Sequence, residues 1–235
     1  IGKAIAKGLA ENGAQVVISS RDQAACDAVV LEFKKEGLKA VSIACHIGKE
    51  TQRKNLVDAT IAAFGRIDIL VNNAGINPVF GPIETVDPTI FDKIMEVNVK
   101  APWSLSNLVL PHLQANKKGS IVNIASVEAL TPGFGLGIYS TSKAAMVMLS
   151  KNQAKEWGKH GIRVNAICPG LIKTKFSAAL WQNEQIVSKL EKALPSGRMG
   201  HPEEMVGLAC LLASDAGAYM TGGVYAADGG YLIAG

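Results

Sequence analysis

A tyrosine and a lysine stand four residues apart in the segment Tyr139-Ser140-Thr141-Ser142-Lys143. On a helix, residues four apart share a face, so the phenol and the ammonium can approach one point. A nearby cation favours the phenolate and lowers the pKa of a tyrosine, which is otherwise about 10. Such a tyrosine can exchange a proton with an alcohol or carbonyl oxygen. Because an amphipathic helix often carries this spacing, the pair indicates acid–base chemistry only together with other residues.

Two further polar residues stand at apolar segments. Ser126 follows the apolar run 121–125, thirteen residues before Tyr139. Its hydroxyl could donate to a carbonyl oxygen as negative charge develops there, or it could simply begin a loop. Asn98 interrupts an apolar helix predicted over residues 88–116. An amide inside a helix is unfavourable, so Asn98 indicates a kink, a bound water or a core amide paired with protein groups.

These residues need a scaffold, and the rest of the chain predicts one. Runs of β-branched residues alternate with helical apolar periodicity. The predicted strands span residues 15–19, 39–44, 68–71, 120–125 and 163–167. The predicted helices span residues 1–10, 23–36, 50–64, 88–116, 138–160 and 202–213. This alternation predicts right-handed crossovers and an α/β fold: a single doubly wound Rossmann-type parallel sheet with helices on both faces.

A doubly wound sheet binds ligands at the carboxyl ends of its strands. Polar or glycine-containing turns follow several predicted strands, at residues 19–21, 72–75, 125–126 and 168–170. The small residues of Asn72-Asn73-Ala74-Gly75 would let a ligand approach the backbone closely. We therefore expect the functional site at this edge. The long irregular region 170–197, with helix-like sequence at 182–193, predicts a lid or pocket wall.

Composition limits the class of protein. The 235 residues are 48% apolar and 19% charged, which predicts one domain with a large core and excludes intrinsic disorder. The net charge of +4 without a basic block argues against nucleic acid, and no apolar run is long enough to cross a bilayer. The four cysteines are far apart, which predicts reduced, buried thiols. We expect a cytoplasmic protein with no metal, nucleic-acid or membrane partner.

Taken together, these residues resemble the short-chain dehydrogenase/reductase family from Ile1 to the C-terminus. The family's tetrad of Asn, Ser, Tyr and Lys matches Asn98, Ser126, Tyr139 and Lys143, with the family's spacings between the last three. The resemblance also implies a set of residues that contact a nicotinamide cofactor besides Tyr139 and Lys143. From the motifs T-G-x-x-x-G-I-G, N-N-A-G and P-G-x-x-x-T these are Ile1, Gly2, Asn73, Ala74, Gly75, Pro169, Gly170, Ile172 and Thr174.

The resemblance implies a role for each member of the tetrad. Tyr139 would be the general acid in carbonyl reduction and the base in alcohol oxidation, and Ser126 would position the substrate oxygen. Lys143 would hold the nicotinamide ribose and lower the pKa of Tyr139. Asn98 would hold a water that links Lys143 to solvent. The family pattern also implies a strand and the start of the glycine loop before Ile1, within one NAD(P)-binding domain that includes residues 1–235.

The segment after the first predicted strand favours NADP(H) over NAD(H). No carboxylate stands at Ser20, and the guanidinium of Arg21 with a neighbouring hydroxyl suits a 2′-phosphate. As an alternative, Ser20 and Gln23 have the spacing of a helix capping box. His46 stands where the family commonly has an Asp near the adenine, so we expect His46 and Ile47 at the adenine, or His46 in an exposed loop.

The predicted substrate pocket combines aliphatic and aromatic residues, which favours an apolar carbonyl or alcohol that is cyclic, aromatic or of medium chain length. Its residues are Ile76, Val127, Glu128, Phe134, Leu136, Phe176 and Trp181. Two alternatives stay open. Phe176 and Trp181 could only pack the lid against the body, and Glu128 could be solvated rather than bound to a polar substrate group.

We therefore expect an oxidoreductase that transfers hydride between NADP(H) and a small carbonyl or alcohol. Segments 46–49 and 165–181 are similar to the NADP-dependent carbonyl (retinol) reductases, and the family implies a homotetramer built through the helices at 88–116 and 138–160. One alternative is reduction of 3-oxoacyl thioesters, with Lys173 and Lys175 facing an acidic carrier protein. Another is a nucleotide-binding scaffold without catalysis, which would not need an intact tetrad.

Overall fold

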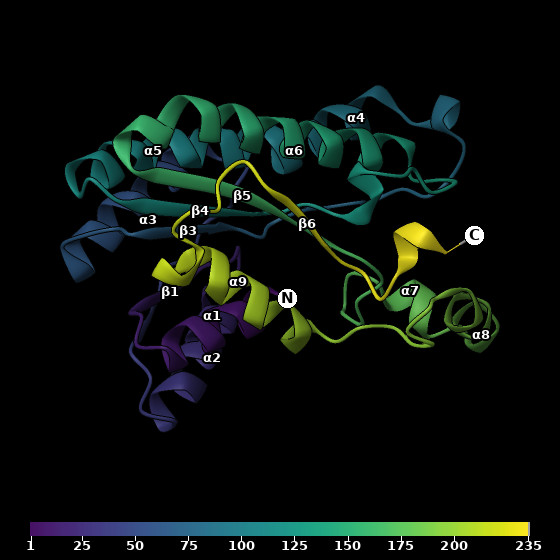
Figure 1. Ribbon diagram of the computed structural model, residues 1–235, viewed down its shortest axis with the longest axis horizontal. Coiled ribbons are helices and arrows are strands. Elements are labelled where there is room, and N and C mark those ends of the chain that lie inside the picture. The colour runs from purple at the N-terminus through teal and green to yellow at the C-terminus, as the bar shows by residue number, and fades with distance from the viewer. Residues whose placement is uncertain (235) are drawn as a thin grey trace.

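In a computed structural model of the protein (Figure 1), residues 1–234 are described, positions 179, 184, 186, 189 and 190 by their backbone alone. Gly235, the last residue of the predicted domain, lies outside the described part. All strand pairs are parallel. The strands are β1 (Val16–Ile18), β2 (Ala40–Ser42), β3 (Ile69–Asn72), β4 (Gly119–Ile124), β5 (Ile162–Pro169) and β6 (Val224–Ala227).

The sheet is divided in two. β1 pairs with β2, whereas β3, β4, β5 and β6 form a four-stranded sheet in that order. Within the described residues, no hydrogen-bonded pairing joins β1 to β3, so each of these strands has one unpaired edge. The predicted class, a doubly wound α/β fold, is confirmed, although backbone hydrogen bonds do not run through one continuous sheet.

Helices cover both faces of the sheet (Figure 1). On one face lie α3 (Glu50–Phe64), α4 (Pro88–Met95), α5 (Ala101–Ala115) and α6 (Gly137–Trp157). On the other lie α1 (Gly2–Glu11), α2 (Gln23–Lys35) and α9 (Val206–Ala213). Two short helices, α7 (Ala178–Trp181) and α8 (Glu184–Ala193), stand apart from these layers in the irregular region that predicted a lid.

Packing explains why these elements form. Every residue of β4 is buried, as expected for a parallel strand covered on both faces. One core cluster joins β4 and β5 to α5 and α6 through side chains such as Leu113, Ile121 and Trp157. A second joins them to α1 and α9. A third surrounds Phe33 and holds α2 against β1 and β2. The two parts of the sheet thus have their own cores.

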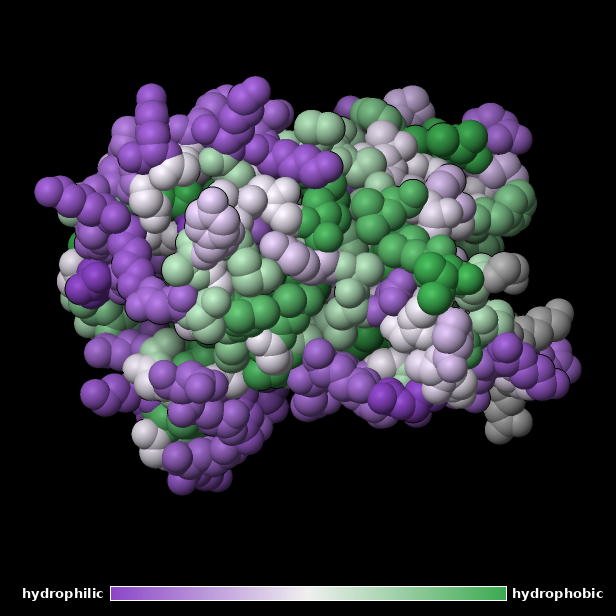
Figure 2. Space-filling model, in the orientation of Figure 1, coloured by the Kyte–Doolittle hydropathy of each residue, from purple (hydrophilic) through white to green (hydrophobic). Residues whose placement is uncertain are grey.

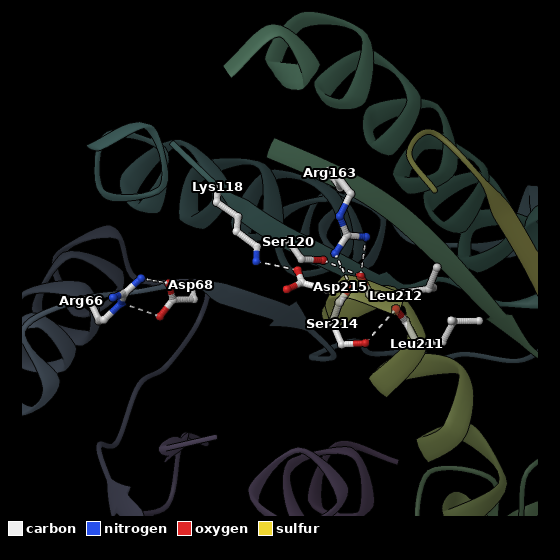
Figure 3. A network of polar contacts seen from close by, with 9 residues as sticks. All are labelled: Arg66, Asp68, Lys118, Ser120, Arg163, Leu211, Leu212, Ser214 and Asp215. Carbon is white, nitrogen blue, oxygen red and sulfur yellow. Dashed lines mark hydrogen bonds and ion pairs between the residues drawn. The ribbon is translucent and has the colours of Figure 1, made fainter. Parts of the chain in front are cut away.

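Polar contacts fix the amino ends of β4 and β5 to the carboxyl end of α9 (Figure 3). The Leu212 carbonyl accepts from Ser120 Oγ at 2.8 Å and from Arg163 Nη1 at 2.7 Å, and Arg163 Nη2 donates to the Ser214 carbonyl at 3.0 Å. Carbonyls at a helix end lack partners within the helix and favour a cation. This network therefore stabilises the edge of the sheet opposite the strand ends where the site is expected.

The predicted helix at 88–116 is interrupted. Between α4 and α5 the chain makes a π-helical turn, Glu96–Lys100, with Asn98 at its centre. A π turn inserts an extra residue into an α-helix and often marks a functional site. The π turn thus explains how the helix accommodates the Asn98 amide, whose contacts are described below.

Candidate active site

Ser126 directly follows the carboxyl end of β4 and begins a short 3-10 turn, Val127–Ala129. Its Oγ accepts a hydrogen bond from the Glu128 backbone N–H at 3.2 Å. A hydroxyl has a single hydrogen to donate, so this contact leaves the Ser126 hydrogen free for another acceptor. The Ser126 side chain is also within hydrogen-bonding reach of Tyr139, where it lowers the pKa of the phenol.

Tyr139 lies in the first turn of α6, and its ring is 6.0 Å from that of Phe176. Burial raises the pKa of Tyr139 to about 12, the hydrogen bond with Ser126 opposes this, and the nearby Glu128 adds to it. The expectation that Lys143 lowers this pKa is not what the structure shows. Burial of the phenolate has the largest effect on this pKa and Lys143 is not among the groups that shift it, so the phenol stays protonated at neutral pH.

Lys143 is buried, with 3% of its surface exposed. Its Nζ donates to the Ile124 carbonyl at 2.9 Å and lies 5.8 Å from the centre of the Tyr139 ring. Burial lowers the pKa of Lys143 to about 8. The predicted approach of phenol and ammonium on one helix face is therefore found, with the ammonium beside the ring.

Asn98 is fully buried and holds three segments together. Its Oδ1 accepts from the Ile76 N–H at 2.8 Å, and its Nδ2 donates to the Ile76 carbonyl at 2.9 Å and to Ser142 Oγ at 3.0 Å. These bonds correspond to the core-amide interpretation of the sequence. They also fix the loop after β3 to the helix that carries Tyr139 and Lys143.

A side chain would be crowded at three of the predicted cofactor-binding glycines. A Cβ on Gly75 would lie 3.2 Å from Lys143 Nζ and 3.6 Å from Asn98 Oδ1. One on Gly2, where α1 begins, would lie 2.6 Å from Asn73 Nδ2. One on Gly170, which follows β5, would lie 2.6 Å from Asp228 Cα. Bare backbone at the carboxyl ends of β3 and β5 suits a ligand that lies flat on the chain.

The remaining predicted cofactor residues after β5 form the base of the lid. Pro169 ends β5, and Ile172 is buried and pairs with Gly200 across an isolated parallel bridge. The Thr174 N–H donates to Ser177 Oγ at 3.1 Å, which fixes the turn before α7. Ala74, beside Gly75, is exposed at the strand edge.

Ser20 and Arg21 are both exposed after β1. Asp22 caps α2, because its side chain accepts from the Ala25 N–H at 3.1 Å. The alternative in which Ser20 starts a capping box is therefore wrong. Among the described residues, Arg21 has no polar partner, so its guanidinium is available to a ligand.

His46 and Ile47 follow β2 and are half-buried, so His46 is not an exposed loop residue. The His46 Nδ1 atom is buried and lacks a hydrogen-bond partner among the described residues. The Ile47 carbonyl accepts from Arg53 Nη1 at 2.5 Å. Arg53, which the sequence did not single out, is buried on α3, bonds Ser104 at 3.1 Å and lies 3.6 Å from Glu96 in the π turn. It connects the predicted adenine loop to the turn that carries Asn98.

The predicted pocket residues differ in how close they lie to Tyr139. Phe176 contacts its ring, whereas Trp181 Nε1 donates to the Thr174 carbonyl at 2.7 Å and Lys173 Nζ lies 5.2 Å from its ring centre. Trp181 therefore packs within the lid, as one alternative proposed. It also lines a cavity of about 390 Å³ that α8 shares and the tetrad does not. Phe134 is 84% exposed.

The other pocket residues form a second wall. Val127 is buried beside Ser126, whereas Ile76 and Leu136 are half-buried at the loop after β3 and the start of α6. Glu128 is half-buried, and one of its carboxylate oxygens is bound by the protein. Its Oε2 accepts from the Gly133 N–H at 2.6 Å and from Ser140 Oγ at 2.9 Å. Apolar side chains gather in the right-hand half of the face in Figure 2, between α4 and the C-terminal end of the chain.

Cys168, another residue that sequence reasoning passed over, lies beneath the site at the end of β5. It is fully buried and accepts a hydrogen bond from the Ser126 backbone N–H. Burial raises the pKa of its thiol to about 11. The thiol is therefore neutral, and it is an inert part of the floor under Ser126 and Lys143.

Comparison with known proteins identifies the family. A family model described as "Enoyl-(Acyl carrier protein) reductase" matches residues 1–232. Proteins called dehydrogenase/reductase SDR family member 4 from Oryctolagus cuniculus and Homo sapiens are 43% and 40% identical to the chain. Each alignment covers 98% of this chain and, respectively, 88% and 83% of the relative. The chain belongs to the short-chain dehydrogenase/reductase family.

Solved structures of short-chain dehydrogenase/reductases agree with this. The gluconate 5-dehydrogenase of Burkholderia cenocepacia J2315, in complex with NADP and tartrate, superposes with a TM-score of 0.95 at 32% identity, covering 100% of this chain and 91% of that one. A proposed NAD(P) dependent gluconate 5-dehydrogenase from Beutenbergia cavernae, with bound NADP, gives 0.93 at 36% identity, with 99% and 92% covered. This short-chain dehydrogenase/reductase is an NAD(P)-dependent oxidoreductase that acts on CH–OH or C=O groups.

Two findings bear on other classes of ligand. Within residues 1–234, every helix is too short or too polar to cross a membrane. Among the described side chains, His, Cys, Asp and Glu do not form a group of three or more that could hold a metal ion. The polar groups that converge are those of the tetrad, which makes the edge around Ser126 and Tyr139 the candidate active site.

Proposed function

We propose that the protein is an NADP(H)-dependent carbonyl reductase or alcohol dehydrogenase that uses Tyr139 as its general acid and base. The observation that supports this best is the convergence of Ser126, Tyr139 and Lys143 at the carboxyl end of β4. Ser126 is hydrogen-bonded to Tyr139, and the Lys143 ammonium lies beside the same ring. Such a group can bind a carbonyl oxygen and protonate it.

In this mechanism Ser126 donates its free hydroxyl hydrogen to the substrate oxygen, and Tyr139 delivers the proton. A bound nicotinamide supplies or accepts the hydride at the substrate carbon. Because the pKa of Tyr139 is raised to about 12, its phenol is protonated at neutral pH and is ready to act as an acid. Carbonyl reduction requires this protonation state of Tyr139, whereas alcohol oxidation requires the phenolate.

Lys143 and Asn98 support the reaction at Tyr139 by binding the cofactor and by supplying protons. Lys143 uses one ammonium hydrogen on the Ile124 carbonyl and keeps two for the ribose hydroxyls of the cofactor. Asn98 Oδ1 and Lys143 Nζ both border the space above Gly75. We propose that Asn98 holds a water there that returns protons from solvent to Lys143.

The proposed preference for NADP(H) rests on Arg21, an exposed guanidinium that is free of polar partners among the described residues. Arg21→Leu should raise the KM for NADPH at least about tenfold and leave the KM for NADH nearly unchanged, because only NADPH has a 2′-phosphate. Lys35→Leu removes the same charge from the exposed end of α2 and is the matched control. Equal losses with both cofactors would contradict the preference.

We propose an apolar carbonyl substrate, because the Phe176 ring lies beside Tyr139 and the buried, apolar Val127 follows Ser126. The test is NADPH oxidation with a panel of ketones, diketones, quinones and aromatic aldehydes. Tyr139→Phe should abolish turnover while the protein still binds NADPH, measured by fluorescence. If wild type binds cofactor but reduces none of them, the scaffold alternative is favoured.

A second candidate is reduction of 3-oxoacyl thioesters. It is favoured by the description of the family model, which names an acyl carrier protein, and by the exposed Lys173 and Lys175 near the lid. Turnover confined to an acetoacetyl thioester would support it. Two further proposals follow the family alone: a homotetramer, which light scattering would measure, and a cytoplasmic location.

A further inference from the structure

Glu128 ties together the loop that covers the candidate substrate site. One of its oxygens accepts from the Gly133 N–H and from Ser140 Oγ, at 2.6 and 2.9 Å. These contacts join residues 131–136, which carry Phe134 and Leu136, to the first turn of α6. A charged acceptor makes hydrogen bonds about twice as strong as a neutral one. The carboxylate therefore fixes the shape of this wall.

The negative charge of Glu128 has no cation paired with it. No Lys, Arg or His among the described side chains forms an ion pair with it. The charge of Glu128 still acts on the reacting group, because the charge raises the pKa of Tyr139. The other titratable groups around Tyr139 are Lys143, which a pKa of about 8 leaves mostly protonated at neutral pH, and the neutral Cys168 thiol.

We infer that Glu128 anchors the substrate loop and excludes carbonyl substrates that carry a carboxylate. This rests on the proposed reductase function. A substrate whose carbonyl lies at Ser126 and Tyr139 must place its remaining groups against the wall that Glu128 holds. A carboxylate there meets an unpaired like charge in a partly buried setting, where screening by solvent is weak.

The expected exclusion of carboxylates contrasts with the ligands named for neighbours that share the fold. The Burkholderia cenocepacia structure is named for gluconate, a carboxylate, and contains tartrate, a dicarboxylate. With the fold held in common, substrate charge must be decided by side chains at the site wall. Glu128 is such a side chain, two positions from Ser126.

Two variants separate the charge of Glu128 from its anchoring role. Glu128→Gln removes the charge and keeps an oxygen that can accept from the Gly133 N–H. Gly133→Ala keeps the charge but crowds the carboxylate and should weaken its contact with the loop, because its Cβ would lie 2.9 Å from Glu128 Oε1. Glu156→Gln is the control for net charge: Glu156 is exposed on α6, about 25 Å along the helix from Tyr139.

The first measurement compares methyl 4-formylbenzoate with 4-carboxybenzaldehyde, which have nearly the same shape and differ in charge. Wild type should reduce the ester with kcat/KM at least about tenfold above that for the acid. Glu128→Gln should narrow this ratio several-fold, whereas Gly133→Ala should raise KM for both and Glu156→Gln should change neither. An unchanged ratio in Glu128→Gln would overturn the charge exclusion.

The second measurement needs no turnover. In wild type and Glu128→Gln the Gly133 amide should exchange slowly with deuterium, and in Glu128→Ala at least about tenfold faster. Equal exchange in Glu128→Ala would overturn the anchor. If wild type reduces neither aldehyde with either cofactor, the proposed function fails. The charge exclusion is then decided by calorimetry: benzoate must bind more weakly than benzamide to wild type and as tightly as benzamide to Glu128→Gln, and any other result overturns it.

Discussion

Lys143 is needed for the proposed reaction, but its buried charge lowers the stability of the fold. It is a buried cation with one hydrogen bond among the described residues, to the Ile124 carbonyl, and burial lowers its pKa to about 8. Between that pH and its unfolded value, the unfolded chain binds a proton that the folded chain has released. Stability therefore rises with pH through this range and is reduced below it.

Lys143→Met should relieve this cost. We expect the variant to melt a few degrees higher than wild type at pH 6, with the difference shrinking toward pH 10, because only the charged ammonium is penalised by burial. Activity should be lost. Thermal unfolding followed by circular dichroism at both pH values checks this. A lower melting temperature at every pH would show that the bond to Ile124 outweighs the buried charge.

Tyr139 should impose opposite pH dependences on the two directions of the reaction. With its pKa raised to about 12, the acid form persists through neutrality, so carbonyl reduction should stay flat from pH 6 to 8. Alcohol oxidation needs the phenolate and should rise with pH across that range. The test is kcat in both directions with saturating cofactor. A fall in oxidation over this range would contradict Tyr139 as the base.

Among the elements, the π turn Glu96–Lys100 positions a tetrad residue, Asn98, with only five residues. Asn98 disturbs an apolar helix, and this signal alone predicts a kink. The type of turn and the partners Ile76 and Ser142 could not be predicted, because they come from segments distant in sequence. The position of Arg53 was even harder to predict. An arginine in a polar helix is typical of an exposed surface, yet Arg53 is buried against Ile47 and Ser104.

Asn98→Ala should destabilise both the turn and the site. It leaves the Ile76 N–H and carbonyl without their partner, at a cost of about 1–3 kcal/mol for a buried polar group. We expect a lower urea midpoint and a larger loss in kcat than in KM for the cofactor. Asn55→Ala, at an exposed position of α3, is the control and should be neutral. Full stability in Asn98→Ala would exclude the structural role.

For the whole molecule, the sequence predicts the class of fold well because alternating strands and helices have few ways to pack. The predicted strands 15–19 and 120–125 correspond to β1 and β4, with β4 beginning one residue earlier than predicted. The predicted single sheet is instead divided into two hydrogen-bonded parts, because the alternation of strands and helices does not determine which strands pair. The fit of side chains such as Glu128 and Gly133 could not be predicted, since it depends on the final geometry of one loop.

The two parts of the sheet should differ in local stability. A two-stranded sheet is marginal unless a helix packs on it, whereas β4 and β5 are covered on both faces. Amides of β1 and β2 should therefore exchange with deuterium faster than those of β4 and β5. Uniform exchange across both parts would contradict this.

The rates at which the four cysteines react with a thiol reagent would measure these opening motions. Cys26 and Cys45 are buried in the part built on β1 and β2, Cys168 is buried in β5, and Cys210 is half-buried on α9. A thiol reagent in excess modifies a buried cysteine only as fast as its surroundings open. Labelling followed by peptide mass spectrometry should therefore proceed in order: Cys210, then Cys26 and Cys45, and Cys168 last. A single chemical reaction thus times the opening of each half of the protein, with the cysteine beneath the tetrad marking complete unfolding.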